Sequence, residues 1–69
     1  DVEDGVIVWQ DSRNGNWDLY VYDLNVQREK AICTDGGDQT RPRIRTGRIV
    51  WEDNRSGDKD IYIYENYMP

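Results

Sequence analysis

The feature that most constrains this chain is an internal repeat without gaps. The segment from Gly5 to Tyr22 recurs from Gly47 to Tyr64, at an offset of 42 residues throughout. Self-similarity at a fixed period is the sequence signature of a repeat architecture. The positions that are identical in the two copies are Gly5/Gly47, Ile7/Ile49, Val8/Val50, Trp9/Trp51, Asp11/Asp53, Arg13/Arg55, Gly15/Gly57, Asp18/Asp60, Tyr20/Tyr62 and Tyr22/Tyr64.

The residue types within one period predict strands. Short runs rich in Val, Ile, Tyr and Trp alternate with clusters of Gly, Asn and Asp, and the apolar spacing of a helical repeat is absent. A strand-built repeat of about 40–45 residues is the period of a β-propeller blade. The predicted fold class is therefore all-β, with β-propeller blades that are four-stranded antiparallel meanders, and no helix. Strands are expected at Val6–Asp11, Asp18–Asp23, Glu29–Cys33, Pro42–Arg45, Arg48–Glu52 and Asp60–Glu65, with Pro42 at a strand start, where a missing N–H does least harm.

Neither copy of the repeat is a complete blade, whose strands we call a to d. Residues 1–34 are expected to form a first blade with part of strand a and strands b, c and d. Residues 35–69 are expected to form a second blade with strands a, b and c, because Asn66–Pro69 does not continue into strand d. The chain then holds about one and two-thirds blades, whereas a closed propeller needs at least about four.

We therefore expect a fragment of a larger or oligomeric propeller. The strand expected at Asp60–Glu65 has a bare edge, and the outer blade faces leave large apolar side chains in water. The expected partners are further propeller blades, either from the rest of a longer parent protein or from self-association. Other proteins are candidate partners as well.

The composition argues against several kinds of partner and of site. The chain has 9 Lys and Arg residues against 14 Asp and Glu residues, a net charge of −5, which disfavours nucleic acid and anionic membranes as partners. No apolar run approaches the roughly 20 residues of a membrane span, so membrane insertion is not expected. Cys33 is the single cysteine, which excludes a disulfide within the chain and a CxxC zinc site.

No catalytic residue and no cofactor are predicted. The chain has no His, so a Ser-His-Asp or Cys-His arrangement is impossible within it. The carboxylates are numerous, but nothing in the sequence singles out an acid and base pair. The sequence therefore predicts a protein that is not an enzyme.

The repeated loop Asp11-x-Arg13-x-Gly15-x-x-Asp18 has two interpretations. Clustered oxygens suit calcium, and the weak metal candidates are Asp11, Asp18, Asp53, Asp58 and Asp60. An Arg, however, occupies the position of a third ligand and opposes a cation. The structural interpretation is that Gly supplies a positive φ, Asp accepts backbone N–H bonds and Arg forks onto an Asp. We favour it, and assign as structural repeat residues Trp9, Asp11, Arg13, Gly15, Asp18, Tyr20, Tyr22, Trp51, Asp53, Arg55, Gly57, Asp60, Tyr62 and Tyr64.

Meander topology also predicts where the loop charges gather. The b–c and d–a connections emerge at one end of the sheets, and the a–b and c–d turns emerge at the other. The first end is the better candidate for ligand binding. Trp17 aligns with Lys59, so it lies outside the repeated core and either contacts a partner or covers its own hairpin. The charged residues expected at the first end are Asp11, Asp18, Asp35, Asp38, Asp53, Asp58, Asp60, Arg13, Arg41 and Arg55.

The repeated residues resemble a known family. The pattern I-V-W-x-D-x-R-x-G-x-x-D-[IL]-Y-[VI]-Y, followed by Asp23-Leu24 and by Gln39 and Pro42 before Gly47, is similar to the TolB-like propeller repeat. That repeat occurs in bacterial periplasmic proteins, in bacterial and archaeal cell-surface proteins and in the propeller of prolyl-oligopeptidase-type enzymes. The resemblance implies an extracytoplasmic location, at the cell surface or in the periplasm, and a scaffolding or protein-binding role.

Two other functions stay open. The chain is alternatively a non-catalytic propeller part of a prolyl-oligopeptidase-like enzyme, which differs only in what lies outside this sequence. A third interpretation is a metal-stabilised binding module, whose melting temperature would depend on calcium.

Overall fold

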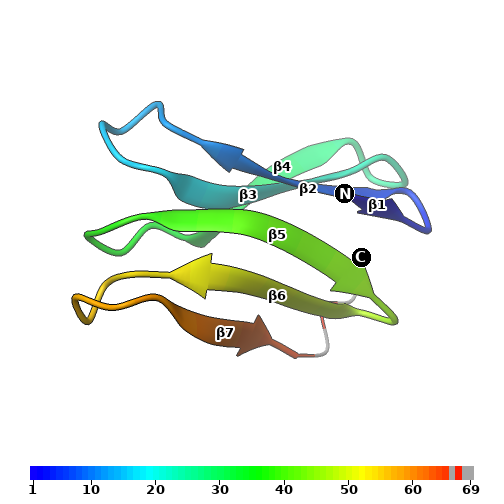
Figure 1. The fold of residues 1–69 in the computed structure, drawn as a ribbon. Coiled ribbons are helices and arrows are strands. Elements are labelled where there is room, and N and C mark those ends of the chain that lie inside the picture. The colour runs from blue at the N-terminus through cyan, green and yellow to red at the C-terminus, as the bar shows by residue number, and fades with distance from the viewer. Residues whose placement is uncertain (66, 68–69) are drawn as a thin grey trace.

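The computed structural model of this chain describes residues 1–65 and residue 67. They form two antiparallel β-sheets and contain no helix (Figure 1). The first sheet has the order β1-β2-β3-β4 and the second the order β5-β6-β7, so each is a meander. The all-β antiparallel prediction is thus confirmed. The strands are β1 (Val2–Glu3), β2 (Val6–Asp11), β3 (Asp18–Asp23), β4 (Arg28–Cys33), β5 (Gln39–Arg45), β6 (Arg48–Asp53) and β7 (Asp60–Tyr64).

The repeat in the sequence is also a repeat in strand pairing. Trp9 on β2 lies opposite Tyr20 on β3, and 42 residues later Trp51 on β6 lies opposite Tyr62 on β7. The chain changes sheet between the end of β4 and the start of β5. No helix that could cross a membrane by its length and apolar character occurs in the described residues.

The largest departure from the predicted strands is at the start of β5. The strand begins at Gln39, whereas the sequence placed its start at Pro42. Arg41 has a φ of 55°, and the register of β5 shifts between Thr40 and Arg43. These are the marks of a β-bulge, which leaves a residue out of the hydrogen-bonded ladder. Pro42 is therefore tolerated inside the strand. The other five predicted strands agree with the structure within one residue at each end, and the predicted absence of strand d falls on residues 66–69, of which the structure describes only 67.

Each sheet has two apolar faces, because successive side chains of a strand point to opposite sides. We call one the aliphatic face and the other the aromatic face, assigned from the strand registers. The aliphatic face consists of Val6, Val8, Leu19 and Val21 in the first sheet and of Val50, Ile61 and Ile63 in the second. The aromatic face consists of Val2, Ile7, Trp9, Tyr20 and Tyr22 in the first sheet and of Ile44, Ile49, Trp51, Tyr62 and Tyr64 in the second.

The core lies between the two sheets. The aliphatic face of the first sheet packs against the aromatic face of the second, and β5 lies along β2 and β3 (Figure 1). Val21 and Ile49 are fully buried in this contact, and Trp51 is 5% exposed. Burial of such side chains contributes roughly 1.5–3 kcal/mol each. The contact between unlike faces therefore holds the sheets together.

All three long loops emerge at one end of the molecule, and the tight turns β1–β2, β3–β4 and β5–β6 emerge at the other (Figure 1). The long loops join β2 to β3, β4 to β5 and β6 to β7. The sequence predicted this division of the connections. Any site built from loop residues consequently lies at the long-loop end.

Candidate functional site

The loop after β2 is closed by a cluster of four repeated side chains. The Asp11 carboxylate accepts hydrogen bonds from the Arg13 backbone N–H at 2.8 Å, from Arg13 Nη2 at 2.8 Å and from the Trp9 indole Nε1 at 3.1 Å. The Arg13 guanidinium lies 4.0 Å over the Tyr20 ring, and Tyr20 stacks on Trp9 with ring centroids 6.2 Å apart. Each member of the cluster thus contacts the next.

The loop after β6 contains the same cluster. Asp53 accepts hydrogen bonds from the Arg55 backbone N–H at 2.9 Å, from Arg55 Nη2 at 2.6 Å and from the Trp51 indole at 3.0 Å. Arg55 lies 4.1 Å over the Tyr62 ring, which stacks on Trp51 at 6.1 Å. We call this arrangement the Trp-Asp-Arg-Tyr cluster.

The clusters hold their carboxylates in the ionised form. Hydrogen bonds from Arg13 are the largest cause that keeps the pKa of Asp11 well below its ordinary value. Burial acts to raise the pKa of Asp53, but the hydrogen bonds from Arg55 and Trp51 outweigh it and lower the pKa to about 2. A carboxylate with so low a pKa carries no proton near neutral pH, so neither Asp is a general acid there.

A second pair of aspartates fastens each loop at its far side. Asp18 accepts a hydrogen bond from Asn14 Nδ2 at 3.0 Å, and Asp60 accepts one from Ser56 Oγ at 2.8 Å. Between the two anchors of each loop the chain turns at a glycine with a φ of 101°, Gly15 or Gly57. That φ favours Gly because it has no Cβ. Both aspartates thus bind their own loops.

The structure does not bring the weak metal candidates together. Asp11 and Asp53 belong to separate clusters, and each is paired with an Arg. Asp58 and Asp60 are exposed, and Asp18 is almost fully buried. Within residues 1–65 and 67 no group of three or more Cys, Asp or Glu side chains is placed to hold a metal ion.

The long-loop end is less acidic at its surface than the sequence suggests. Asp18 and Asp53 are each only 1% exposed, so their charges do not face solvent. Asp35 forms an ion pair with Arg55, which further reduces the free negative charge. Asp18 and Asp53 are buried by their own loops, so they do not add to the negative charge at the surface of this end.

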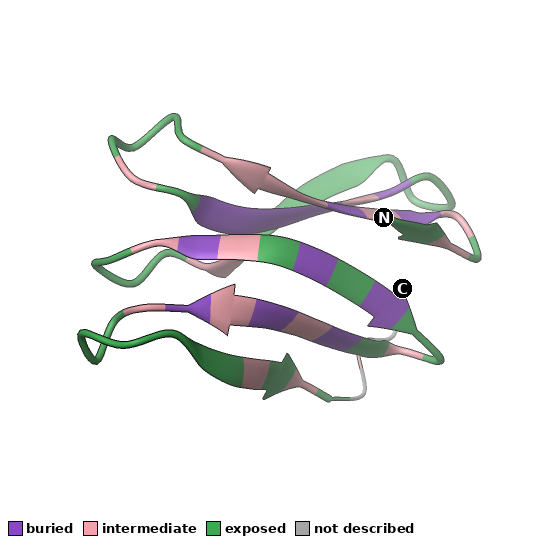
Figure 2. Ribbon diagram, in the orientation of Figure 1, coloured by how far each residue is buried: buried purple, intermediate pink, exposed green. Residues whose placement is uncertain are grey.

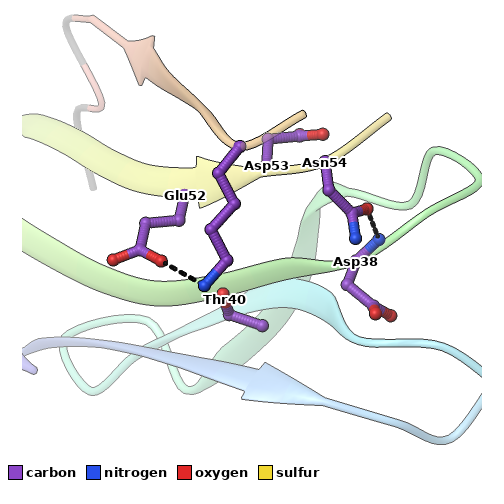
Figure 3. Close-up of a pocket in the computed structure, with 6 residues that line it drawn as sticks. Asp38, Thr40, Glu52, Asp53 and Asn54 are labelled. Carbon is purple, nitrogen blue, oxygen red and sulfur yellow. Dashed lines mark hydrogen bonds and ion pairs between the residues drawn. The ribbon is translucent and has the colours of Figure 1, made fainter. Parts of the chain in front are cut away.

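A cavity of about 170 Å³ lies at this end, between the start of β5 and the loop after β6 (Figure 3). Its polar groups are paired with one another: Lys59 Nζ lies 3.2 Å from Glu52 Oε1, and Asn54 Oδ1 accepts the Asp38 backbone N–H at 2.6 Å. The hydrogen bond from Lys59 is the main cause that lowers the pKa of Glu52. The residues that line the cavity are Asp38, Thr40, Glu52, Asp53, Asn54 and Lys59.

The two sheets are joined at the long-loop end by the main chain of Trp17. Its backbone N–H donates to Asp38 Oδ1 at 3.0 Å, and its carbonyl accepts the Gln39 N–H at 2.7 Å. Gln10 Oε1 accepts the Arg41 N–H at 3.0 Å beside it. The Trp17 indole itself is partly exposed, with a residue exposure of 39%. We call these contacts the polar joint.

Sequence reasoning missed several residues of this region. Glu52 and Lys59 align with Gln10 and Trp17, so comparison of identical positions passed over them. Gln39 is fully buried, and neither its Nε2 nor its Oε1 has a hydrogen-bond partner among the described residues. The offset of 42 residues could have located Glu52 and Lys59, because they are the equivalents of Gln10 and Trp17 of the polar joint.

The repeated polar groups of this end contact one another and stabilise the loops after β2 and β6. The polar joint, which is present once, connects the two sheets. No protein-family model matches the chain, and no curated protein and no solved structure matches it. The functional assignment accordingly rests on the contacts within this chain.

Proposed function

We propose that this chain is a non-catalytic β-propeller repeat module that serves as a structural scaffold and an interaction surface. The observation that carries the proposal is the duplicated Trp-Asp-Arg-Tyr cluster. In both sheets the Asp accepts bonds from the Trp and the Arg, while the Arg lies about 4 Å over the Tyr. Polar groups that satisfy one another in every copy support a role in architecture.

The stacking of unlike faces supports the blade assignment. Around a propeller axis each blade presents one face to the preceding blade and the other face to the following blade. In this chain the aliphatic face of the first sheet covers the aromatic face of the second. The TolB-like resemblance of the repeat adds an extracytoplasmic location, in the periplasm or at the cell surface, with protein contacts made at the long-loop end.

The experiment that tests this proposal compares cluster variants in thermal unfolding. Asp11→Asn and Asp53→Asn each weaken charge-assisted bonds, so each should lower the melting temperature by several degrees. Asp58→Asn is the matched control, because Asp58 is exposed and belongs to no cluster. Tryptophan fluorescence and far-UV circular dichroism provide the two readouts.

The same melts with millimolar calcium or with a chelator separate a scaffold from a metal-stabilised module. We expect calcium to leave the melting temperature unchanged in the wild type and in all three variants. A calcium-dependent rise in the wild type that Asp11→Asn or Asp53→Asn abolishes would reject the scaffold assignment in favour of a metal loop.

A further inference from the structure

Residues 1–65 and 67 leave the aliphatic face of the second sheet uncovered. Ile61 is 69% exposed and Ile63 is 53% exposed, whereas their equivalents in the first sheet, Leu19 and Val21, are 1% and 0% exposed. The first-sheet pair is buried because the aromatic face of the second sheet packs on it. The molecule therefore contains one filled and one open copy of the same apolar surface.

The aromatic face of the first sheet is open in part, although Tyr20 on this face is only 8% exposed. Val2 is 60% exposed and Trp9 is half-buried, whereas their equivalents Ile44 and Trp51 are each 5% exposed. The first sheet thus repeats the aromatic residues of β6 and β7, but β5, which lies on β2 and β3 in the filled contact, has an equivalent only in the short β1. One chain therefore carries the aliphatic half of a second such contact and most of its aromatic half.

The open aliphatic face of the second sheet has a hollow. It lies at the place where, in the first sheet, a side chain of the aromatic face packs. A cavity of about 280 Å³ lies beside Val50 and is bordered by Arg43, Arg45 and Arg48, which share this face by the register of β5 and β6. Asp1, Ile44 and Thr46 also line it. In the first sheet the corresponding place, next to Asp1 and Val8, is occupied by Ile44, whose N–H donates to Asp1 Oδ2 at 3.1 Å. The equivalent of Ile44 on the open aromatic face is the exposed side chain of Val2.

The charges at the border of the two open faces are complementary. In the filled contact Val6 and Glu3 line a hollow together with Thr46 and Gly47 of the second sheet. A shift of 42 residues replaces Val6 by Arg48 and Glu3 by Arg45 on one side.

On the other side of the open faces, the same shift replaces Thr46 by the exposed Asp4. If the two open faces packed in the register of the filled contact, Arg45 and Arg48 on one face would lie opposite Asp4 on the other. Such an arrangement fixes orientation and suppresses wrong pairings.

We propose that the aliphatic face of the second sheet binds the aromatic face of the first sheet of a second copy of this chain. The contact repeats between molecules the packing that the two sheets make within one molecule, with Val2 of one copy in the hollow between Arg43 and Arg48 of the other. It rests on the proposed function, because it requires the two sheets to be stackable blades. The contact is head-to-tail, so each copy keeps one open face of each kind until a ring closes.

Sedimentation velocity across a dilution series measures the association. The wild-type chain should sediment as oligomers that dissociate on dilution. Ile61→Lys blocks the aliphatic face and Val2→Lys blocks the aromatic face, where it also meets the three arginines. Each variant should weaken association at least tenfold. Val26→Lys is the matched control, because Val26 is 55% exposed in the β3–β4 turn and lies on neither face.

Mixing the two blocked variants tests the head-to-tail geometry. Ile61→Lys retains an intact aromatic face, and Val2→Lys retains an intact aliphatic face. The mixture should therefore form a 1:1 dimer and nothing larger, although each variant alone is monomeric. Self-association of either variant alone through like faces would overturn the proposal. A wild-type chain that stays monomeric at every concentration would also overturn it.

A charge exchange provides a test that does not remove apolar area. Arg48→Asp should weaken association, and the further change Asp4→Arg in the same chain should restore it, with circular dichroism verifying the fold of each variant. Failure of Asp4→Arg to restore association would contradict the register. If the wild-type chain does not self-associate, but Asp11→Asn and Asp53→Asn lower the melting temperature as expected, a second copy is refuted as the partner and the scaffold function stands.

Discussion

The strands β3 and β7 have nearly the same sequence and the same pairing but opposite burial. Leu19 on β3 is 1% exposed, whereas its equivalent Ile61 on β7 is 69% exposed. In Figure 2 β3 is drawn almost entirely as buried and β7 as exposed or intermediate. β3 lies between two strands and beneath β5, whereas in the part of the chain that the structure describes β7 pairs with β6 alone. The repeat thus determines pairing and alternation, and the neighbours determine burial.

The Trp-Asp-Arg-Tyr clusters show the opposite behaviour. The two copies agree within a few tenths of an ångström in every shared contact, although one cluster lies in the filled contact and the other on the open face. The contacts that the two clusters share are made within one hairpin, so they do not depend on the neighbouring sheet, although Arg13 also pairs with Glu29 and Arg55 with Asp35. The repeated sequence therefore determines the contacts within a sheet, whereas the contacts between sheets depend on which neighbouring sheet is present.

The largest expected difference between the copies is at the tryptophans. Trp51→Ala removes a side chain from the core between the sheets, so it should lower the free energy of unfolding by about 3–5 kcal/mol. Trp9→Ala removes a half-buried side chain and should cost about 1–2 kcal/mol. Urea unfolding followed by circular dichroism measures both. Equal costs would show that Trp9 is covered in solution.

The aliphatic faces offer the next comparison. Leu19→Ala should cost about 2–5 kcal/mol, because it leaves a cavity in the core. Ile61→Ala should change stability by less than about 0.5 kcal/mol in dilute solution, where the side chain stays in water. Repeating the urea titration at high protein concentration sharpens the test. If a second copy covers Ile61, the cost of Ile61→Ala increases with concentration.

The two cluster aspartates should differ in their contribution to acid stability. The pKa of Asp53 falls to about 2 in the folded chain, from an ordinary value of 3.8. A lowered folded-state pKa stabilises the protein above pH 4, and that stabilisation, up to about 2 kcal/mol, is lost as the pH decreases from about 4 to about 2. The stability difference between wild type and Asp53→Asn should therefore shrink across this range. Hydrogen bonds from Arg13 lower the pKa of Asp11 as well, but solvent screens its side chain, which is 20% exposed, whereas that of Asp53 is fully buried. Asp11→Asn should therefore show the smaller change.

The smallest expected contrast is between Asp18 and Asp60. Asp18→Asn alters a buried acceptor of the Asn14 amide and should cost about 1 kcal/mol. Asp60→Asn alters an exposed acceptor of the Ser56 hydroxyl and should cost only a few tenths of a kcal/mol. Thermal melts of the two single variants measure the contrast. Identical losses would mean that Asp60 is buried in solution.

Features that depend on local pattern could be predicted from the sequence. Alternating Val, Ile and Tyr between Gly-rich loops located most strand ends to within a residue, and meander topology placed the long loops at one end. The pairing of the loop Arg with an Asp was likewise expected, because Arg13 follows Asp11 by two residues and precedes Asp18 by five. These features need only short-range information.

Features that depend on distant residues could not be predicted. The bulge at Arg41 arises from how Thr40 and Arg43 pair with β6, which the sequence around Pro42 does not reveal. The burial of Gln39 runs against the usual exposure of glutamine and follows from its place at the polar joint. The cavity beside Glu52 was missed because, of the residues that line it, only Asp53 has an identical equivalent in the other copy. In each case the decisive neighbour lies far along the chain.

The polar joint has a consequence for how such a protein diversifies. Trp17 holds Asp38 and Gln39 through its peptide group, so the attachment does not depend on which side chain stands there. The two copies already differ at this position, with Trp in one and Lys in the other. After a gene duplication, mutation can change the side chain at this position in each repeat while the main-chain bonds between the sheets are kept. Each repeat can then present a different side chain at the long-loop end.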